Sequence, residues 1–100
     1  MKISNEDKKQ LRRLGHNLNP VVTVAGNGLS KNVLAEIDRA LNDHELIKVK
    51  ICGGDSKVKS EVIKEICERL SAQTVQSVGH IALLLKKSEK PNPRLSNLLR

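Results

Sequence analysis

The segment that decides the fold covers residues 20–31 and reads Pro20-Val21-Val22-Thr23-Val24-Ala25-Gly26-Asn27-Gly28-Leu29-Ser30-Lys31. Its first half is rich in β-branched residues, which favour a buried strand. Gly26 and Gly28 allow backbone conformations that other residues avoid, and Ser30 is a good N-cap for a helix. The segment therefore predicts a strand, a glycine loop and a helix N-terminus, whose free N–H groups attract phosphate.

The glycine loop lacks the motifs of nucleotide-binding proteins. A P-loop requires Gly-Lys followed by Ser or Thr after an earlier glycine, and the chain contains no such string. A dinucleotide fingerprint would require a third glycine at position 31, where the chain has Lys31. A plain tight turn between strand and helix is the alternative interpretation of the loop.

The composition favours a single basic domain with a polyanionic partner. The chain has 100 residues, no Phe, Tyr or Trp, and a formal net charge of +7. Residues 1–20 hold five Lys or Arg against two acids, and residues 86–100 hold five against one. Two basic ends predict a polyanion. Because single-strand binders stack bases on aromatic rings, we expect contacts to phosphates and sugars of structured RNA, with DNA as an alternative.

The hydropathy pattern predicts the order helix, strand, helix, strand, helix, strand, strand. We place these elements at residues 4–15, 20–24, 30–42, 45–52, 55–70, 74–78 and 81–86. The strand–helix–strand crossovers predict parallel neighbours, and the final hairpin adds an antiparallel edge. We therefore expect one α/β domain, α+β-like, with a mixed four-stranded sheet covered by helices. Residues 88–100 form a basic, proline-broken tail that we expect to be mobile.

The first predicted helix combines a narrow apolar stripe with a broad cationic face. Its cations fall within an arc of roughly 140° opposite the apolar stripe; they are Lys8, Lys9, Arg12 and Arg13. An ordinary solvated face is the alternative. In the strand at 45–52, alternation puts Lys48 and Lys50 opposite the apolar side chains. These two lysines are weaker candidates for binding, because a helix could cover their face of the sheet.

The remaining residues give no signal for catalysis, metal binding or membrane insertion. Cys52 and Cys67 lack the spacing of a zinc site, and Cys67 continues an apolar helix face, as a reduced, packed thiol does. The histidines lie between predicted elements, where we expect surface or capping roles; they are His16, His44 and His80. The longest apolar run, residues 81–85, is too short to span a bilayer, and the N-terminus lacks a signal-peptide core. We expect a cytoplasmic, non-enzymatic protein without cofactor or metal.

Several motifs resemble those of the bacterial YhbY-type proteins of the CRM group, named for chloroplast RNA splicing and ribosome maturation. They are His44-Glu45-Leu46-Ile47-Lys48-Val49-Lys50, Leu14-Gly15-His16 before Pro20-Val21-Val22, and Gly28-Leu29-Ser30. The resemblance covers residues 1–87, which it delimits as a CRM-like RNA-binding domain. It implies a fold similar to the C-terminal domain of translation initiation factor three. It also implies RNA binding and association with precursors of the large ribosomal subunit.

The resemblance further implies a role for the glycine loop. The family's loop reads Gly-x-x-Gly and is compared with the KH-domain loop that clamps a nucleic-acid backbone. Ala25 stands at the first glycine position of this pattern, with Gly26 beside it, and Gly28 matches the last. We therefore expect backbone N–H groups of Gly26, Asn27 and Gly28 to hold a phosphate, with Lys31 beside them.

These inferences predict a monomeric, non-catalytic RNA-binding protein of large-subunit assembly, whose partner is ribosomal RNA or its precursor particle. The candidate RNA contacts are Gly26, Asn27, Gly28, Lys31, Lys8, Lys9, Arg12, Arg13, Lys48 and Lys50. The cations of the first helix would extend the contact if that helix packs near the loop. The alternative is a protein-interaction module whose basic ends dock on an acidic protein.

Overall fold

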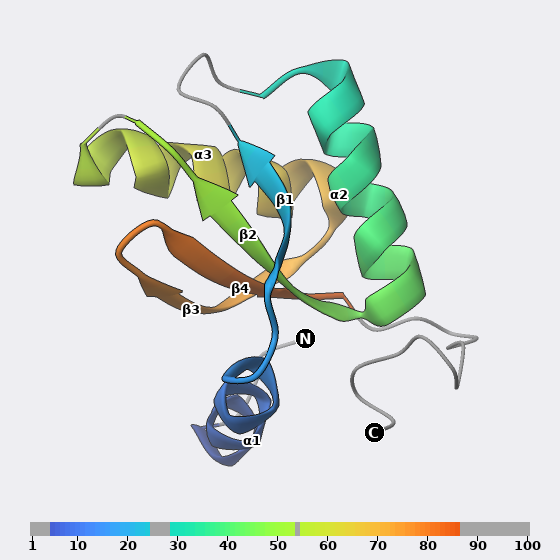
Figure 1. The fold of residues 1–100 in the computed structure, drawn as a ribbon, viewed down its shortest axis with the longest axis vertical. Coiled ribbons are helices and arrows are strands. Elements are labelled where there is room, and N and C mark those ends of the chain that lie inside the picture. Colours follow the sequence, from blue (N-terminus) through green and yellow to red (C-terminus); the bar gives the residue numbers. More distant parts are fainter. Residues whose placement is uncertain (1–4, 25–28, 54, 87–100) are drawn as a thin grey trace.

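The computed structural model describes residues 5–24, 29–53 and 55–86, and it confirms the predicted order of elements (Figure 1). The elements are α1 (Asn5–Gly15), β1 (Pro20–Val24), α2 (Lys31–His44), β2 (Leu46–Ile51), α3 (Ser56–Leu70), β3 (Gln73–Val78) and β4 (Ile81–Leu85). Their ends coincide with the predicted ends or differ from them by at most two residues. The tail from residue 88 and the loop residues 25–28 lie outside the described residues. Within the described ranges, no helix is long and apolar enough to cross a membrane.

The four strands form one mixed sheet in the order β1-β2-β4-β3. β1 pairs parallel with β2, whereas β4 pairs antiparallel with both β2 and β3. The prediction of parallel neighbours is therefore correct for β1 and β2 but wrong for β2 and β3, which β4 separates. The physical reason is composition. Every residue of β4 is apolar and suits an inner position covered on both faces, whereas the mostly exposed, polar β3 suits an edge.

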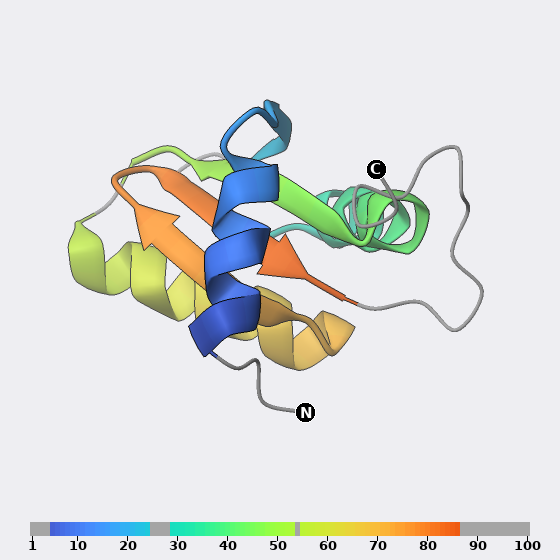
Figure 2. The ribbon, with the colours of Figure 1, turned by 90° about the horizontal axis from the view of Figure 1, so that it is seen from below.

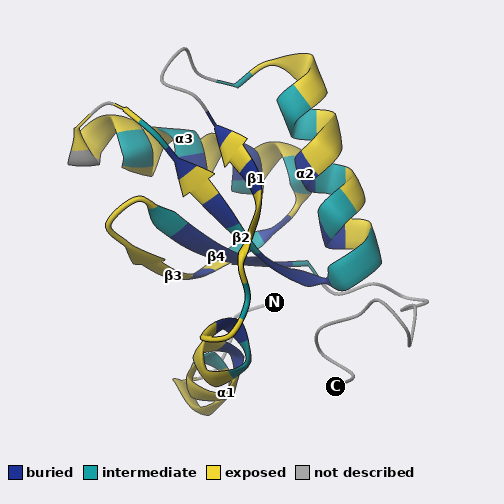
Figure 3. Cartoon of the chain, in the orientation of Figure 1, coloured by how far each residue is buried: buried dark blue, intermediate teal, exposed yellow. Residues whose placement is uncertain are grey.

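Helices cover both faces of the sheet, with α2 and α3 on one side and α1 on the other (Figure 2). The larger core lies under α2 and α3, where side chains such as Ile37, Ile66 and Val49 are fully buried. The smaller core lies under α1, where Leu11 packs with residues of three strands, namely Leu46, Val75, Leu83 and Leu85. Figure 3 shows the buried residues on the strands and on the inner sides of the helices. The sheet therefore separates two hydrophobic cores of unequal size and contributes side chains to both.

Gly15 sets the distance between α1 and the sheet. The helix ends at Gly15, as predicted, but this glycine does not adopt the positive φ of a C-terminal glycine cap. A Cβ atom at position 15 would lie only 2.7 Å from Leu83 Cδ2, so the close approach to β4 is what requires a glycine. Gly79, in contrast, has φ of 58° in the β3–β4 turn and open space around its Cα, so there the backbone conformation requires it.

Both helices that follow a parallel strand begin at their predicted caps. Ser30 Oγ accepts a hydrogen bond from the Val33 N–H (3.1 Å), and Asp55 Oδ1 accepts one from the Val58 N–H (2.9 Å). At the other end of α2, Glu45 has φ of 63° and donates its N–H to the Leu41 carbonyl (2.8 Å). Glu45 is therefore the C-cap of α2, whereas the sequence predicted it as the first residue of β2.

Candidate nucleic-acid interface

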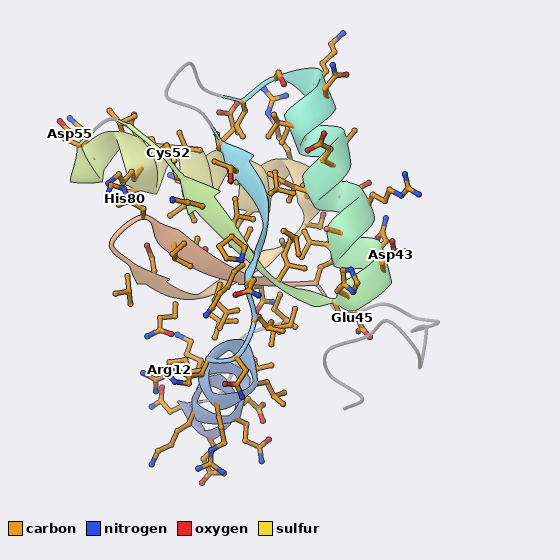
Figure 4. All side chains as sticks on the ribbon, viewed as in Figure 1. Arg12, Asp43, Glu45, Cys52, Asp55 and His80 are labelled. Atoms are coloured by element: carbon orange, nitrogen blue, oxygen red, sulfur yellow. The ribbon has the colours of Figure 1, made fainter. Side chains whose placement is uncertain are left out.

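α1 presents the cationic face that the sequence predicts. Its four cations comprise the half-buried Lys8 and the exposed Lys9, Arg12 and Arg13. Arg12 and Arg13 lie in the last turn, where the negative end of the helix dipole favours cations (Arg12 is labelled in Figure 4). Glu6 and Asp7 lie in the first turn. The helix therefore has its two acids at the N-terminal end and its two arginines at the C-terminal end.

Two lysines of β2 lie on the same face of the sheet as α1. Side chains alternate along a strand, and Ile47 and Val49 belong to the core under α2 and α3. Leu46, Lys48 and Lys50 therefore face the side of α1. Leu46 is buried in the smaller core, Lys48 is half-buried and Lys50 is exposed. α1, the helix that could have covered these lysines, thus covers only the beginning of β2.

The neighbouring strand leaves the same part of this face uncovered. Thr23 of β1 pairs with Lys50 in register, and both side chains are exposed. Val21 lies at the irregularity of β1 and is 50% exposed, but it lines a groove with Glu36 and Arg39 of α2. We call the accessible residues on the side of α1 the open half-face, which consists of Thr23, Lys48 and Lys50. It offers two ammonium groups and a hydroxyl, and none of its three residues carries a carboxylate.

The cations of α1 and β2 are not neutralised by ion pairs in the described part of the chain. The ion pairs recorded there join Arg69 with Glu65 (3.0 Å) and Lys86 with Asp38 (3.3 Å). Neither involves α1 or β2. We call the six cations of these two elements the cationic strip; they are Lys8, Lys9, Arg12, Arg13, Lys48 and Lys50. Four of the six are exposed and two are half-buried, so their charge is available to a polyanion.

The carboxyl ends of β1 and β2 lie at one edge of the sheet, because the two strands are parallel. The Cys52 N–H donates to the Val24 carbonyl (2.9 Å) at this edge. α2 begins here with the exposed Lys31, and the first turns of α2 and α3 contain no acid. The expected phosphate contacts of the loop lie outside the described residues and stay predictions; they are Gly26, Asn27 and Gly28.

α1 and the beginning of α2 lie at opposite ends of the molecule (Figure 1). The condition that α1 packs near the glycine loop is therefore not met. β2 runs between the two ends, and it carries Lys48 and Lys50 about 7 Å apart along the strand. The candidate residues that the structure describes thus lie along an elongated surface and not in one pocket.

The sequence pattern did not predict one basic pair at the carboxyl edge. Lys59 Nζ of α3 lies 2.6 Å from His80 Nδ1, although 21 residues separate them along the chain. Figure 4 shows His80 at the corner where β2 ends and α3 begins. The sequence did carry one signal, because Lys59 precedes the buried Ile63 by four residues and so shares its side of the helix. Nothing in the periodicity pointed to His80 as the partner.

The chemistry of the remaining titratable residues is that of packed or surface groups. Among the described residues, no three His, Cys, Asp or Glu side chains gather to hold a metal. Cys67 lines an open groove between α3 and β3, with its Sγ 3.2 Å from Thr74 Oγ1. Burial raises the pKa of the Cys67 thiol, and the hydrogen bond with Thr74 opposes this shift only in part. Such a thiol is a poor nucleophile, as expected of the packed cysteine that the sequence predicts.

Comparison with known proteins gives consistent matches over nearly the whole chain. Residues 3–86 match the family model described as the CRS1 / YhbY (CRM) domain. A probable RNA-binding protein of Pseudomonas aeruginosa is 47% identical over 100 residues, which cover 100% of this chain and 96% of that protein. An RNA-binding protein of Haemophilus influenzae is 47% identical over 93% of this chain and 94% of its own length. The solution structure of a hypothetical Staphylococcus aureus protein, an RNA-binding candidate, superposes with a TM-score of 0.78 at 27% identity, covering 89% of this chain and 93% of that one.

Proposed function

The chain belongs to the CRS1/YhbY (CRM) domain family, and on this basis we propose that it is a non-catalytic, monomeric RNA-binding protein of the cytoplasm. Its proposed partner is structured ribosomal RNA in precursors of the large ribosomal subunit. The observation that carries the proposal is the cationic strip, which has no ion-pair partner within the described residues. Two of its lysines, Lys48 and Lys50, belong to the open half-face, whose residues carry no carboxylate. A polyanion is the ligand that such a surface favours.

The proposed contacts are to phosphates and sugars. Arg12 and Arg13 offer planar guanidinium groups that bind phosphate oxygens in pairs, and the lysines of β2 act as point charges beside them. Gly26, Asn27 and Gly28 contribute backbone N–H groups at the N-terminus of α2, beside Lys31. Because the chain has no aromatic side chain, it has no platform on which bases stack. We therefore expect recognition of a folded RNA by its shape and a steep dependence of affinity on salt.

Sucrose-gradient sedimentation of a cell extract tests the ribosomal part of the proposal. The protein should comigrate with large-subunit precursors at low salt and move to the top of the gradient at high salt or after treatment with ribonuclease. A protein that stays at the top of the gradient at low salt would contradict the ribosomal assignment. That result would favour the alternative in which the basic ends dock on an acidic protein.

The glycine loop is tested separately by Asn27→Asp, which adds a negative charge at nearly constant shape and leaves both glycines in place. If the loop holds a phosphate, RNA affinity should fall several-fold through charge repulsion. Asn42→Asp, at an exposed position near the other end of α2, is the matched control and should leave affinity nearly unchanged. Equal losses in the two variants would argue that the loop is only a tight turn.

A further inference from the structure

Lys59 occupies a position of α3 that normally carries an apolar residue. At 3.6 residues per turn, it shares a side of the helix with Ile63 and Ile66, which are buried against the sheet. α3 begins at Ser56, so Lys59 lies in its first turn, at the margin of the core, and is half-buried. A lysine in this place keeps its carbon chain on the apolar surface and extends its ammonium to the carboxyl edge of the sheet.

The ammonium of Lys59 contacts a histidine there and not a carboxylate. Because a lysine ammonium only donates, His80 Nδ1 accepts the hydrogen bond of 2.6 Å, which leaves the ring hydrogen on Nε2. Two basic side chains gain no attraction of opposite charges from this contact. The pair carries one positive charge, two further ammonium hydrogens and one ring N–H at Nε2. These are the groups that an anionic oxygen would accept hydrogen bonds from.

The pair has no anionic partner among the described residues. The recorded ion pairs of the described ranges lie elsewhere, one within α3 and one between α2 and Lys86, the residue after β4. Asp55, one turn before Lys59, uses its Oδ1 to cap α3 by accepting from the Val58 N–H (2.9 Å). Glu61 is exposed and lies about 200° around the helix from Lys59.

The pair also lies where the cationic strip ends. The Ile51 N–H donates to the His80 carbonyl (2.7 Å), which fixes the β3–β4 turn at the end of β2. Lys50 pairs in register with Ile81, the residue after His80. Positive and N–H donor groups thus continue from α1, through Lys48 and Lys50, to the carboxyl edge.

From these observations we propose that Lys59 and His80 together bind one phosphate group of the RNA strand that Lys48 and Lys50 contact. The inference rests on the proposed function and deepens it, because it adds two contact residues and defines the path of the RNA strand over the protein. The RNA backbone runs along β2, from α1 at one end of the molecule to the corner formed by the β3–β4 turn and α3.

Fluorescence anisotropy of the full chain with a labelled RNA hairpin, repeated at several salt concentrations, tests the pair. Lys59→Gln removes one charge and should lower affinity roughly three- to tenfold and reduce the salt slope by about one. His80→Ala removes a neutral donor and should lower affinity roughly two- to fivefold with the salt slope unchanged. The double variant should lose little more than Lys59→Gln alone, because the two side chains act on one phosphate.

Lys64→Gln is the matched control, since it removes the same charge from an exposed position farther along α3. It should change affinity less than about twofold, because a charge outside the contact contributes only a screened, long-range attraction. If Lys59→Gln weakens binding no more than Lys64→Gln does, the proposed pair is wrong. The proposed function then stands as long as the wild-type chain binds the hairpin with steep salt dependence. A wild-type chain that binds neither the hairpin nor ribosomal RNA at low salt overturns both.

A second readout needs no variant and is therefore independent of any loss of folding. In nuclear magnetic resonance spectra of the wild-type chain, addition of the hairpin should shift the ring nitrogen resonances of His80. The resonances of His44, at the far end of α2, should stay in place. An unshifted His80 at saturating RNA would overturn the pair, whatever the variants show.

Discussion

The two faces of the sheet use the same strands in different ways. On the face under α2 and α3, the side chains of β1 and β2 are apolar and buried; they are Val22, Val24, Ile47, Val49 and Ile51. On the face of α1, the alternate positions of these strands hold Thr23, Leu46, Lys48 and Lys50, and only Leu46 is buried. One face therefore supplies stability, while the other is covered only as far as α1 needs for its own packing. The remainder is free to bind a ligand.

Removing apolar volume from the stabilising face should have the largest effect. Leu84 of β4 is fully buried and pairs in register with Ile47. Leu84→Ala is expected to lower the free energy of unfolding by about 2–5 kcal/mol, measured by urea denaturation, because it leaves a cavity in the larger core. RNA affinity of the molecules that remain folded should not change. A large loss of RNA affinity in fully folded Leu84→Ala protein would show that the two faces are not separate in function.

Charge reversal on α1 should lower RNA affinity and leave stability nearly unchanged, which is the converse of the effect of Leu84→Ala. Arg12→Glu combined with Arg13→Glu is expected to lower RNA affinity about 100-fold and to flatten its salt dependence, because the phosphate contacts become repulsive. The free energy of unfolding should change by at most about 1 kcal/mol, since both side chains are exposed.

The matched control reverses two exposed cations on the other side of the sheet, Arg39 of α2 and Lys64 of α3, and so changes the net charge equally. Anisotropy titrations should show a much smaller loss for this control. Equal losses would mean that the net charge matters and the position of the charge does not.

Gly15→Ala tests how α1 is seated on the sheet. Helix propensity alone would predict a gain of up to about 1 kcal/mol. The clash with Leu83, which is 3% exposed, instead predicts a loss of about 1–3 kcal/mol in the free energy of unfolding. Thermal and urea denaturation distinguish a gain from a loss in the free energy of unfolding. Gly79→Ala, where the Cβ meets no atom but φ is positive, should cost about 1 kcal/mol and serves as the comparison for backbone strain.

The exposed end of the open half-face should contribute more to RNA binding than its half-buried part. Lys50→Gln is expected to lower affinity roughly threefold and the salt slope by about one. Lys48→Gln should have a smaller effect, because α1 already limits access to that side chain. Anisotropy at graded salt measures both. A larger effect for Lys48 would place the RNA closer to α1 than we propose.

The smallest effect concerns the thiol of Cys67, far from the open half-face. Because burial raises the pKa of this thiol in the folded state, folding favours its protonated form. Its contribution to stability is therefore present below the pKa of the unfolded thiol, about 8.5, and is lost as the pH rises above that value. Wild-type stability should fall more than that of Cys67→Ala between about pH 8 and pH 10. Parallel falls in the two proteins would contradict a raised pKa, and RNA affinity should be the same in both.

The sequence predicted what depends on neighbours along the chain. The caps at Ser30 and Asp55, the alternation of β2 and the cationic face of α1 each follow from local spacing, and the structure confirms them. Periodicity shows which side a residue faces but not what lies opposite. It therefore missed that β4 separates β2 from β3 and that α1 stops short of Lys50.

The contacts that connect distant segments were missed for the same reason. Gly15 meets Leu83, and Lys59 meets His80, only because the hairpin of β3 and β4 enters the sheet beside β2. The cations of the candidate site could thus be identified from the sequence, but their accessibility and their arrangement along β2 could not.

The inner position of β4 has a consequence for how the protein is made. β4 is the last described element of the chain, yet it joins β2 to β3 in the sheet. While the chain is being synthesised, the edges of β2 and β3 that later face β4 have no partner until residues 81–85 emerge. The domain therefore cannot close progressively from its N-terminus, and its apolar interior stays accessible to chaperones and to aggregation until translation of those residues is complete. The sheet therefore closes only after residues 81–85 have been synthesised.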